Sequence, residues 1–205
     1  MTNYLAVDTS SRYLTVIAKK GNKTALRHIP ECAMQHSVIL MDEIEKAFSE
    51  ADLTPAECDF FCAVTGPGSF TGIRIGVSAI KGFALAAGKP VKAVTAFDLL
   101  AYNVNSAQTF YVVIDAAHSH YYVCGYTDGR ISLQPCYLSE EEVKALNAPI
   151  YGFEDLPFEA FTKLNPKDCF EKAAERAEIS DGIHALYVRK SQAEENLNGN
   201  KRVEV

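Results

Sequence analysis

One pattern in this 205-residue sequence occurs twice and constrains the fold more than any other. An apolar stretch that ends in an aspartate, Tyr4–Asp8, is followed by a short polar turn and a second β-rich stretch, Tyr13–Ala18. The same succession returns 107 residues further on, with Asp115 in the position of Asp8, and continues to Val123. A repeat of this size indicates a duplicated structural unit. The sequence therefore predicts two related lobes, each beginning with an antiparallel hairpin.

Strand-length and helix-length apolar patterns alternate along the rest of the chain. We expect further strands at 24–30, 60–64, 91–94 and 150–153, and helices at 35–50, 54–57, 97–102, 139–146 and 166–177. A long helix should also follow residue 68 and end near Gly88. This alternation is typical of α/β proteins. We predict an N-terminal lobe with the long helix (1–103), a smaller, degenerate C-terminal lobe (104–190) and a polar tail (191–205).

A glycine-rich segment joins the strand at 60–64 to the long helix. The predicted strand-to-helix turn comprises Gly66, Pro67, Gly68 and Ser69. Wound as a helix, the residues that follow form a stripe of mostly small side chains. That stripe comprises Gly72, Gly76, Ala79, Phe83 and Ala86. Such a stripe either admits a partner helix or packs on the protein's own sheet, and the sequence leaves both readings open.

The glycine segment matches none of the familiar phosphate or nucleophile motifs. Gly66 and Gly68 lack the third glycine of the dinucleotide fingerprint, and no Gly-Lys-Ser/Thr follows them. Ser69 is outside a Gly-x-Ser-x-Gly frame. His118 and His120 flank the repeated turn without an acidic third ligand nearby, and no His-x-x-x-His occurs. We therefore expect neither a metal nor a cofactor.

The aspartates of the two repeats raise the question of nucleotide binding. Actin-like and sugar-kinase-like ATPases hold magnesium and phosphates with a strand-end aspartate and the N–H groups of a tight turn. The first turn continues Asp8 with Thr9, Ser10 and Ser11, which supply hydroxyls but no glycine. The second turn, from Asp115 to His118, supplies neither. We interpret Asp8, Thr9, Ser10 and Asp115 as degenerate nucleotide-site turns.

Composition excludes several classes of function. A net charge of −6 argues against binding a polyanion with this surface alone. The six cysteines form no Cys-x-x-Cys, which favours reduced thiols in a cytoplasmic protein. We expect no signal peptide, because no basic region precedes the strand-length apolar run at the N-terminus, and we expect no membrane helix, because no segment approaches the ~20 apolar residues that one needs.

Several of these segments resemble one known family. The matching segments are Leu5–Ser10, Gln35–Ser37, Gly66–Gly76, Ile114–Ala116 and Tyr187–Arg189. Together they resemble the bacterial TsaB (YeaZ) family. The Gly-Pro-Gly-Ser-Phe-Thr-Gly run is the most specific of them, and the matches follow in order over residues 4–189. The second lobe is the weaker half, because Ala117 stands where the family often has arginine.

The resemblance implies an α/β fold of two actin-like lobes (ASKHA, ribonuclease H-like), each a mixed sheet with flanking helices. It also implies a role in making threonylcarbamoyladenosine, the modified base beside the anticodon of tRNAs that read ANN codons. The resemblance further implies a non-catalytic subunit that binds the catalytic paralogue TsaD, and the ATPase TsaE joins the two. Homodimers can use the same surface, and tRNA would be bound only through the complex.

In that family the first helix and the glycine-rich helix pair with their equivalents in TsaD. Carried onto this sequence, the resemblance implies a partner-binding set on these two helices. The set comprises His36, Leu40, Met41, Ile44, Gly72, Ile73, Gly76, Ala79, Ile80 and Phe83. Two other functions remain open: a small-molecule kinase or ATPase that uses Asp8 and Asp115, and a peptidase that uses Ser69 or a cysteine.

Overall fold

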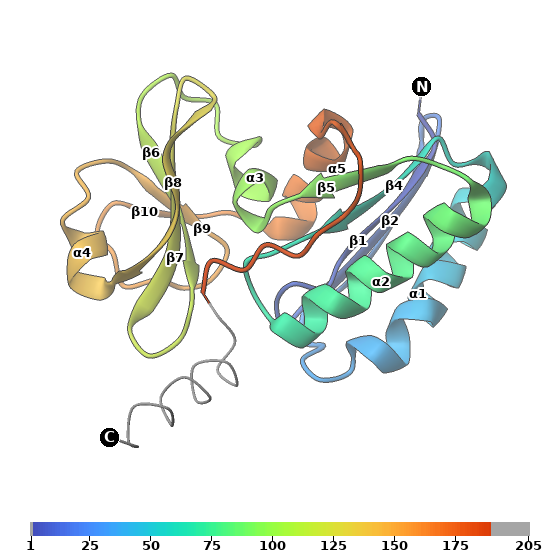
Figure 1. Ribbon diagram of the computed structural model, residues 1–205, viewed down its shortest axis with the longest axis horizontal. Coiled ribbons are helices and arrows are strands. Elements are labelled where there is room, and N and C mark those ends of the chain that lie inside the picture. Colours follow the sequence, from blue (N-terminus) through green and yellow to red (C-terminus); the bar gives the residue numbers. More distant parts are fainter. Residues whose placement is uncertain (1, 190–205) are drawn as a thin grey trace, which may run out of the picture.

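The computed structural model describes residues 2–189, which form two lobes lying side by side (Figure 1). The predicted polar tail, 191–205, lies outside the described residues. The first lobe is built on a six-stranded sheet of order β11-β5-β4-β1-β2-β3. Its strands are β1 (Tyr4–Asp8), β2 (Leu14–Lys20), β3 (Lys23–Ile29), β4 (Phe60–Val64), β5 (Val91–Val94) and β11 (Ile179–Ser180).

The second lobe repeats the topology of the first. Its five-stranded sheet has the order β10-β9-β6-β7-β8, which corresponds strand by strand to β5-β4-β1-β2-β3. In both sheets the first strand pairs antiparallel with the second and parallel with the fourth. The strands are β6 (Phe110–Asp115), β7 (His120–Thr127), β8 (Arg130–Ser139), β9 (Ile150–Gly152) and β10 (Phe161–Lys163). The prediction of two mixed-sheet lobes that begin with matching hairpins is confirmed.

Five helices complete the layers on the faces of the sheets. Helices α1 (His36–Ala51) and α2 (Phe70–Ala87) cover one face of the first sheet. Helices α3 (Ala96–Ala101) and α5 (Pro166–Arg176) lie between the two lobes, and α4 (Glu140–Lys144) covers the far face of the second sheet. A 3-10 helix, Pro55–Glu57, precedes β4. The second lobe has no helix between β9 and β10, where the first lobe has α2 between β4 and β5.

Strand β1 shows why the first lobe is a buried sheet. All five of its residues are buried, because helices cover both faces. Leu5 and Val7 pack toward α1 and α2, whereas Tyr4 and Ala6 pack into the core that the two lobes share. A strand covered on both sides requires a continuous apolar run, which is the pattern that the sequence shows.

Local sequence sets both ends of α2. Ser69 is the N-cap residue, and its Oγ accepts the Gly72 N–H at 3.2 Å. Gly88 ends the helix in the left-handed conformation, with φ +64, as glycine does readily. The helix is long and apolar enough to span a membrane by those measures alone. One face of α2 packs on the first sheet, so length and hydropathy are weak support for a membrane role.

The division of the chain at residue 103 is wrong as a boundary between lobes. After the second sheet the chain returns, and β11 pairs with β5 of the first sheet. Ile183 then enters the core beneath α1 and α2. The first lobe therefore consists of residues from both ends of the chain. The sequence did not indicate this because β11 has only two residues, and neither is buried.

Strands β8 and β10 were also not predicted. Strand β8 lies at the edge of the second sheet and its ten residues are all exposed or half-buried. An edge strand of this kind lacks the alternating apolar pattern that identifies a half-buried strand. Strand β10 has three residues, fewer than a periodic pattern needs.

Candidate functional site

The glycine turn closes over the first repeated turn. The Ser69 N–H donates to the Ser10 carbonyl oxygen at 2.7 Å. A Cβ atom on Gly68 would lie 2.1 Å from that same oxygen, so only glycine fits there. Gly66 and Gly68 also have φ of +100 and +156, and Pro67 follows a cis peptide bond. The first repeated turn, at the place where an actin-like ATPase binds phosphate, is therefore covered here by the protein's own backbone.

Asp8 is fully engaged inside the first lobe. Its Oδ1 accepts the N–H and the Oγ–H of Ser10, at 2.9 and 2.7 Å, and its Oδ2 accepts the Tyr13 hydroxyl at 2.9 Å. The side chain is buried, and burial raises its pKa, partly offset by the hydrogen bonds from Ser10 and Tyr13. All three hydrogen bonds come from the first lobe itself, and Asp8 is not among the residues that line the cleft between the lobes. This arrangement of Asp8 supports the interpretation of a degenerate turn.

Thr9 connects the same turn to helix α2. Its Oγ1 donates to the Gly72 carbonyl oxygen at 2.7 Å. A Cβ atom on Gly72 would lie 2.1 Å from the Thr9 carbonyl oxygen, and one on Gly76 would lie 2.4 Å from Thr9 Oγ1. These two glycines let α2 lie directly on the end of β1. The expectation that they form a docking face for another protein is wrong, because their open side faces this chain.

Burial corrects most of the predicted partner-binding set in the same way. The buried members are His36, Leu40, Ile44, Gly72, Ile73, Gly76 and Ile80. His36, for example, lies within 3.0 Å of the Tyr13 carbonyl oxygen through Nε2, and this contact ties the start of α1 to β2. Met41 is exposed, and Ala79 and Phe83 are half-buried, so they alone of the set reach the surface. Their role in binding stays a prediction.

The exposed side of α1 and α2 carries several apolar side chains. The most exposed of its side chains are Met34 (96%), Leu85 (86%), Val38 (73%) and Met41 (53%). Met34 lies in the turn before α1. Val38 and Met41 of α1 are three residues apart, and Ile75, Ser78, Gly82 and Leu85 of α2 follow one another at three, four and three. These are the spacings of one helix face. We call this surface the α1–α2 face, comprising Met34, Val38, Met41, Ile75, Ser78, Gly82 and Leu85.

Gly82 differs from the other glycines of α2. It lies inside the helix and is exposed, and apart from its chain neighbours and the backbone of the helix itself, no atom of the described residues lies within 4 Å of a Cβ atom built there. Glycine inside a helix costs about 1 kcal/mol relative to alanine. Nothing within residues 2–189 uses the space that this glycine leaves. Met34 adds a second unusual feature, since it holds a left-handed φ of +66 beside the start of α1.

The sequence contained a signal for this face that the stripe of small residues obscured. The helix carries an exposed Leu85 and an exposed Ala86 in addition to its buried apolar residues, so it is apolar on more than one side. A helix that is apolar beyond the width of its core-facing stripe indicates a second apolar contact. The stripe of small residues through Gly72 and Gly76 faces the core. A second stripe of small residues, through Ser78 and Gly82, is exposed.

The second repeated turn is open to the space between the lobes. Asp115 is exposed, its Oδ1 accepts the Ala117 N–H, and its own N–H donates to Glu154 Oε2, both at 2.9 Å. Ala117, His118 and Ser119 all have left-handed φ angles of +55 to +64. Burial raises the pKa of Glu154, and the Asp115 N–H partly offsets this rise.

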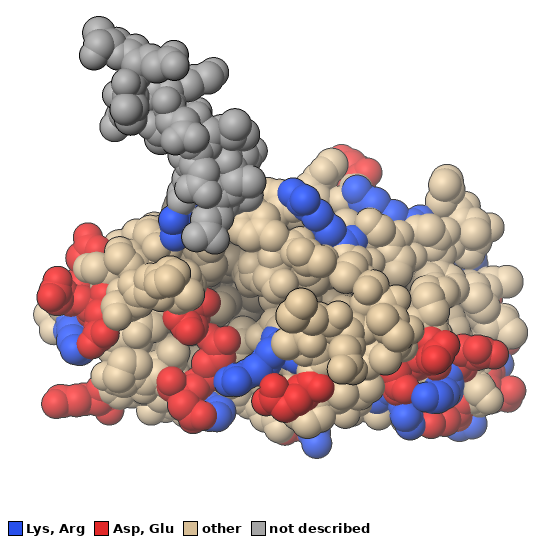
Figure 2. Space-filling model, turned by 90° about the horizontal axis from the view of Figure 1, so that it is seen from below, with Lys and Arg blue, Asp and Glu red and all other residues tan. Residues whose placement is uncertain are grey.

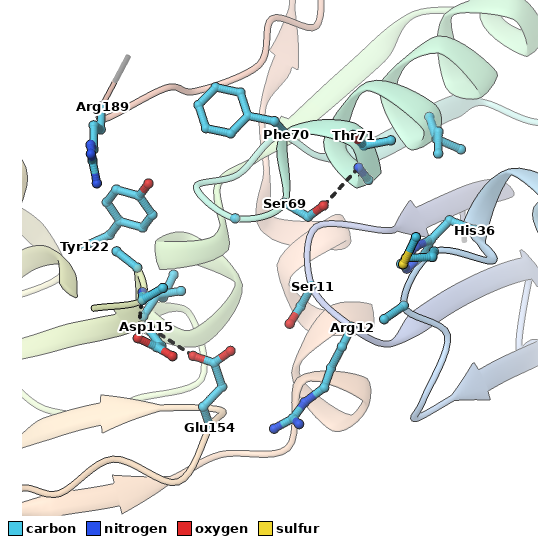
Figure 3. Close-up of a pocket in the computed structure, with 18 of the residues that line it drawn as sticks. Ser11, Arg12, His36, Ser69, Phe70, Thr71, Asp115, Tyr122, Glu154 and Arg189 are labelled. Carbon is cyan, nitrogen blue, oxygen red and sulfur yellow. Dashed lines mark hydrogen bonds between the residues drawn. The ribbon is translucent and has the colours of Figure 1, made fainter. Parts of the chain in front are cut away.

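A cleft of about 950 Å³ lies between the two turns. Ser11, Arg12, Ser69 and Thr71 line it from the first lobe, and Asp115, Glu154 and Arg189 line it from the other side (Figure 3). Arg12 extends toward Glu154 across this cleft. Since Asp8 is occupied within the first lobe, only one aspartate of the repeated pair faces the cleft. Within residues 2–189, no group of three or more His, Cys, Asp or Glu side chains is placed to hold a metal ion.

The candidate nucleophiles are committed to other contacts. Ser69 Oγ caps α2. Burial raises the pKa of all six cysteine thiols, for example to about 12 for Cys62 and about 11 for Cys169. A thiol in an apolar environment with a raised pKa is a poor nucleophile. These contacts argue against the peptidase hypothesis.

The segment after β11 fixes the first turn of α2 from outside. The Leu186 N–H donates to the Thr65 carbonyl oxygen at 2.8 Å. Tyr187 stacks on Phe70, with ring centroids 4.7 Å apart, and its hydroxyl accepts the Arg74 Nε–H at 2.9 Å. Arg189 in turn donates to the Tyr137 hydroxyl of the second lobe at 2.9 Å. This segment therefore contacts both lobes beside the cleft.

Comparison with known proteins identifies relatives of one kind. A sequence model of the family described as "TsaD: tRNA N6-adenosine threonylcarbamoyltransferase" matches residues 26–151. The tRNA threonylcarbamoyladenosine biosynthesis protein TsaB of Bacillus subtilis is 31% identical over 48% of this chain and 43% of its own length. The protein of that name from Haemophilus influenzae is 32% identical over 58% of this chain and 51% of its own length. The matched region thus spans about half the length of these relatives.

A solved structure agrees with the fold. The structure of YeaZ from Pseudomonas aeruginosa covers 91% of this chain and all of that chain, with a TM-score of 0.73 and 22% sequence identity. At this identity the similarity establishes the two-lobed fold alone.

Proposed function

Because this chain belongs to the TsaD family, described as tRNA N6-adenosine threonylcarbamoyltransferase, and is a TsaB (YeaZ) member of it, we propose that it acts in tRNA threonylcarbamoyladenosine biosynthesis. Its role there is that of a non-catalytic subunit in the cytoplasm. It docks on a TsaD-type paralogue, which carries out the transfer and engages the tRNA, and a TsaE-type ATPase joins the pair. A homodimer through the same helices is the alternative assembly.

The observation that carries this proposal is the α1–α2 face. Leu85, Val38 and Met34 are largely exposed, although together they would bury substantial apolar area in a complex. Gly82 leaves open space in the middle of this face. A small residue at such a point lets the axis of a partner helix come close, as in tightly packed helix pairs. Two adjacent helices with this surface fit a partner that presents two apolar helices of its own.

The engagement of Asp8 supports a binding role over a catalytic one. An actin-like ATPase needs its strand-end aspartate for the cation, and here both oxygens of Asp8 are held by Ser10 and Tyr13. Calorimetry of the isolated chain with ATP and magnesium separates the two functions. We expect no binding at micromolar nucleotide. Micromolar affinity that is lost in Asp8→Ala would favour the small-molecule kinase or ATPase instead.

The docking role is tested by measuring affinity for the TsaD-type paralogue of the same organism. Leu85→Asp and Gly82→Leu should each weaken binding at least tenfold, because the first places a charge in the apolar face and the second fills the space at its centre. Ile131→Asp changes an exposed apolar residue of β8 in the second lobe and serves as the matched control. Unchanged binding in both face variants would show that the partner docks elsewhere.

A further inference from the structure

The two long edges of the α1–α2 face carry opposite charge. Helix α2 contains Arg74 and Lys81 and no acidic residue. Helix α1 contains four acidic residues and one lysine. Figure 2 shows a mostly uncharged band on the right half of the molecule, with Lys and Arg and a smaller patch of Asp or Glu along its upper edge and a cluster of Asp and Glu, with some basic side chains among them, at its lower right.

The basic edge lies on the side of α2 that faces away from α1. Arg74 and Lys81 are both exposed and are separated by two turns, so they lie on one line along the helix. Phe83, which contacts Phe48 of α1 with ring centroids 5.9 Å apart, lies on the opposite flank. Arg74 is held in place by Tyr187, whose ring centroid lies 5.7 Å from the guanidinium carbon.

The acidic edge is the exposed side of α1, where Glu45 follows Met41 at a spacing of four and so lies in line with the apolar residues of the face. Two of the four carboxylates are already paired, since Glu43 contacts Arg27 and Lys46, and Glu50 contacts Arg27. Asp42 and Glu45 are exposed, and they do not take part in the ion pairs of α1 within the described residues. These two carboxylates are therefore the charges that α1 presents to a partner.

We propose that the occupant of the α1–α2 face is a TsaD-type paralogue whose contacting helices carry the reverse charge. Acidic side chains of the partner lie opposite Arg74 and Lys81, and basic side chains lie opposite Asp42 and Glu45. This inference rests on the proposed function. Like charges facing each other across an interface cost several kcal/mol, whereas complementary edges steer the encounter and fix the orientation.

Charge adds orientation to the few apolar contacts that the face offers. The exposed apolar side chains within the two helices are Val38 and Met41 near the start of α1 and Leu85 and Ala86 near the end of α2. Only one orientation of the partner places its acidic side chains opposite the basic edge on α2 and its basic side chains opposite the acidic edge on α1. Arg74 and Asp42 thereby act as specificity determinants at the rim.

The experiment uses the full chain and the TsaD-type paralogue of the same organism, with association rate and affinity measured at low and high salt. Arg74→Glu with Lys81→Glu, and separately Asp42→Lys with Glu45→Lys, should each slow association about tenfold at low salt, with a smaller effect at high salt. Lys81→Glu alone should show the same direction, and it leaves the contact between Arg74 and Tyr187 intact. Control pairs with equal charge changes on other surfaces are Arg130→Glu with Lys172→Glu, and Glu159→Lys with Glu178→Lys.

The outcomes separate this inference from the proposed function. If Leu85→Asp abolishes binding but the edge variants behave like their controls, docking stands and the charge assignment is overturned. If either edge variant strengthens binding, the partner's polarity is opposite to the proposal. If the unmodified chain does not bind the paralogue, the proposed function fails with it. A last variant combines all four changes, at Arg74, Lys81, Asp42 and Glu45. If each edge variant loses pairing with a second copy of the chain, the combined variant regains it, and the paralogue does not bind, a second copy is the occupant and the proposal is overturned.

Discussion

Asp8 holds the first turn together from inside the protein. It is the acceptor for three donors on Ser10 and Tyr13, and it is surrounded by buried residues. Removing a buried acceptor leaves its donors unsatisfied, which costs about 1–3 kcal/mol for each donor. The residue therefore has a structural reason to be an aspartate without any ligand.

Asp8→Asn and Asp8→Ala should have different effects on stability. Burial raises the native pKa of Asp8 above its unfolded value, so between these two values the native state binds a proton that the unfolded state has lost. The free energy of unfolding contributed by Asp8 is thus greatest at acid pH and falls as pH rises through the native pKa. Asparagine keeps the acceptor for Ser10 without the charge. The stability of the Asp8→Asn variant relative to the unmodified protein should therefore rise with pH between the unfolded and the native pKa of Asp8.

Denaturant unfolding of the three proteins from pH 4 to pH 8 provides the measurement. Asp8→Ala should lose at least about 2 kcal/mol at every pH, because Ser10 and Tyr13 lose their acceptor. A difference between the Asn variant and the unmodified protein that does not change with pH would show that Asp8 does not titrate in this range.

The roles of individual glycines could be predicted only in part. The turn at Gly66–Ser69 and the end of α2 at Gly88 follow from local rules of chain geometry. Which glycines of α2 face inward depends on where Thr9 lies, and Thr9 is more than sixty residues away in sequence. A helical projection gives the angle between residues but not the direction of the core. For this reason Gly72 and Gly76 were assigned to the wrong side of the helix.

At the scale of the element, α2 is one helix with two apolar faces and two kinds of glycine. Its inner face rests on β1 through Gly72 and Gly76, and its outer face leaves Gly82 exposed. The inner glycines are fixed by contacts within the chain, whereas the outer one is not. Substitution by alanine should therefore act in opposite directions at the two places.

Gly72→Ala should lower the free energy of unfolding by about 1–3 kcal/mol, because its Cβ would meet the Thr9 carbonyl oxygen at 2.1 Å. Gly82→Ala should raise it by about 0.5–1 kcal/mol, since alanine has the better helix propensity and nothing lies in its way. Urea unfolding of both variants, each compared with the unmodified chain, tests the pair. A loss of stability in Gly82→Ala would mean that the exposed position has a contact within the protein.

Element boundaries were predicted well where the apolar pattern was periodic or a capping motif was present. Strand β4 begins and ends where it was expected, and α1 differs by one residue at each end. Strands β8 and β11 were not predicted because an exposed edge strand and a two-residue strand carry no periodic apolar signal. The pattern of a sequence records burial, so elements that bury little were the ones left undetected.

At the scale of the whole molecule, the duplicated topology was predictable and the path of the chain between the lobes was not. The repeated hairpins identified two lobes, and the two sheets share one strand order. Helix α5 and strand β11 nevertheless return to the side of the first sheet, where Lys19 of β2 pairs with Glu171 of α5 at 2.8 Å. This return depends on long-range packing, which no local pattern reports.

The two lobes should therefore not fold as separate fragments cut at residue 103. A fragment of residues 1–103 lacks β11, α5 and the buried Ile183, so it should show a low unfolding midpoint or remain unfolded. Adding a fragment of residues 104–205 should restore a cooperative transition, because the second fragment supplies the missing edge of the first sheet. Circular dichroism of each fragment and of the mixture measures this. A fully stable, cooperative 1–103 fragment would contradict it.

The return of the chain also gives assembly an order in time. Helices α1 and α2 leave the ribosome early, but the segment with Leu186 and Tyr187, which fixes the first turn of α2 and orients Arg74, is synthesised only after the entire second lobe. A nascent chain therefore carries an apolar docking surface whose basic edge has not yet been set. On the proposed function, the complete charge pattern that selects the partner is present only after synthesis has passed Tyr187.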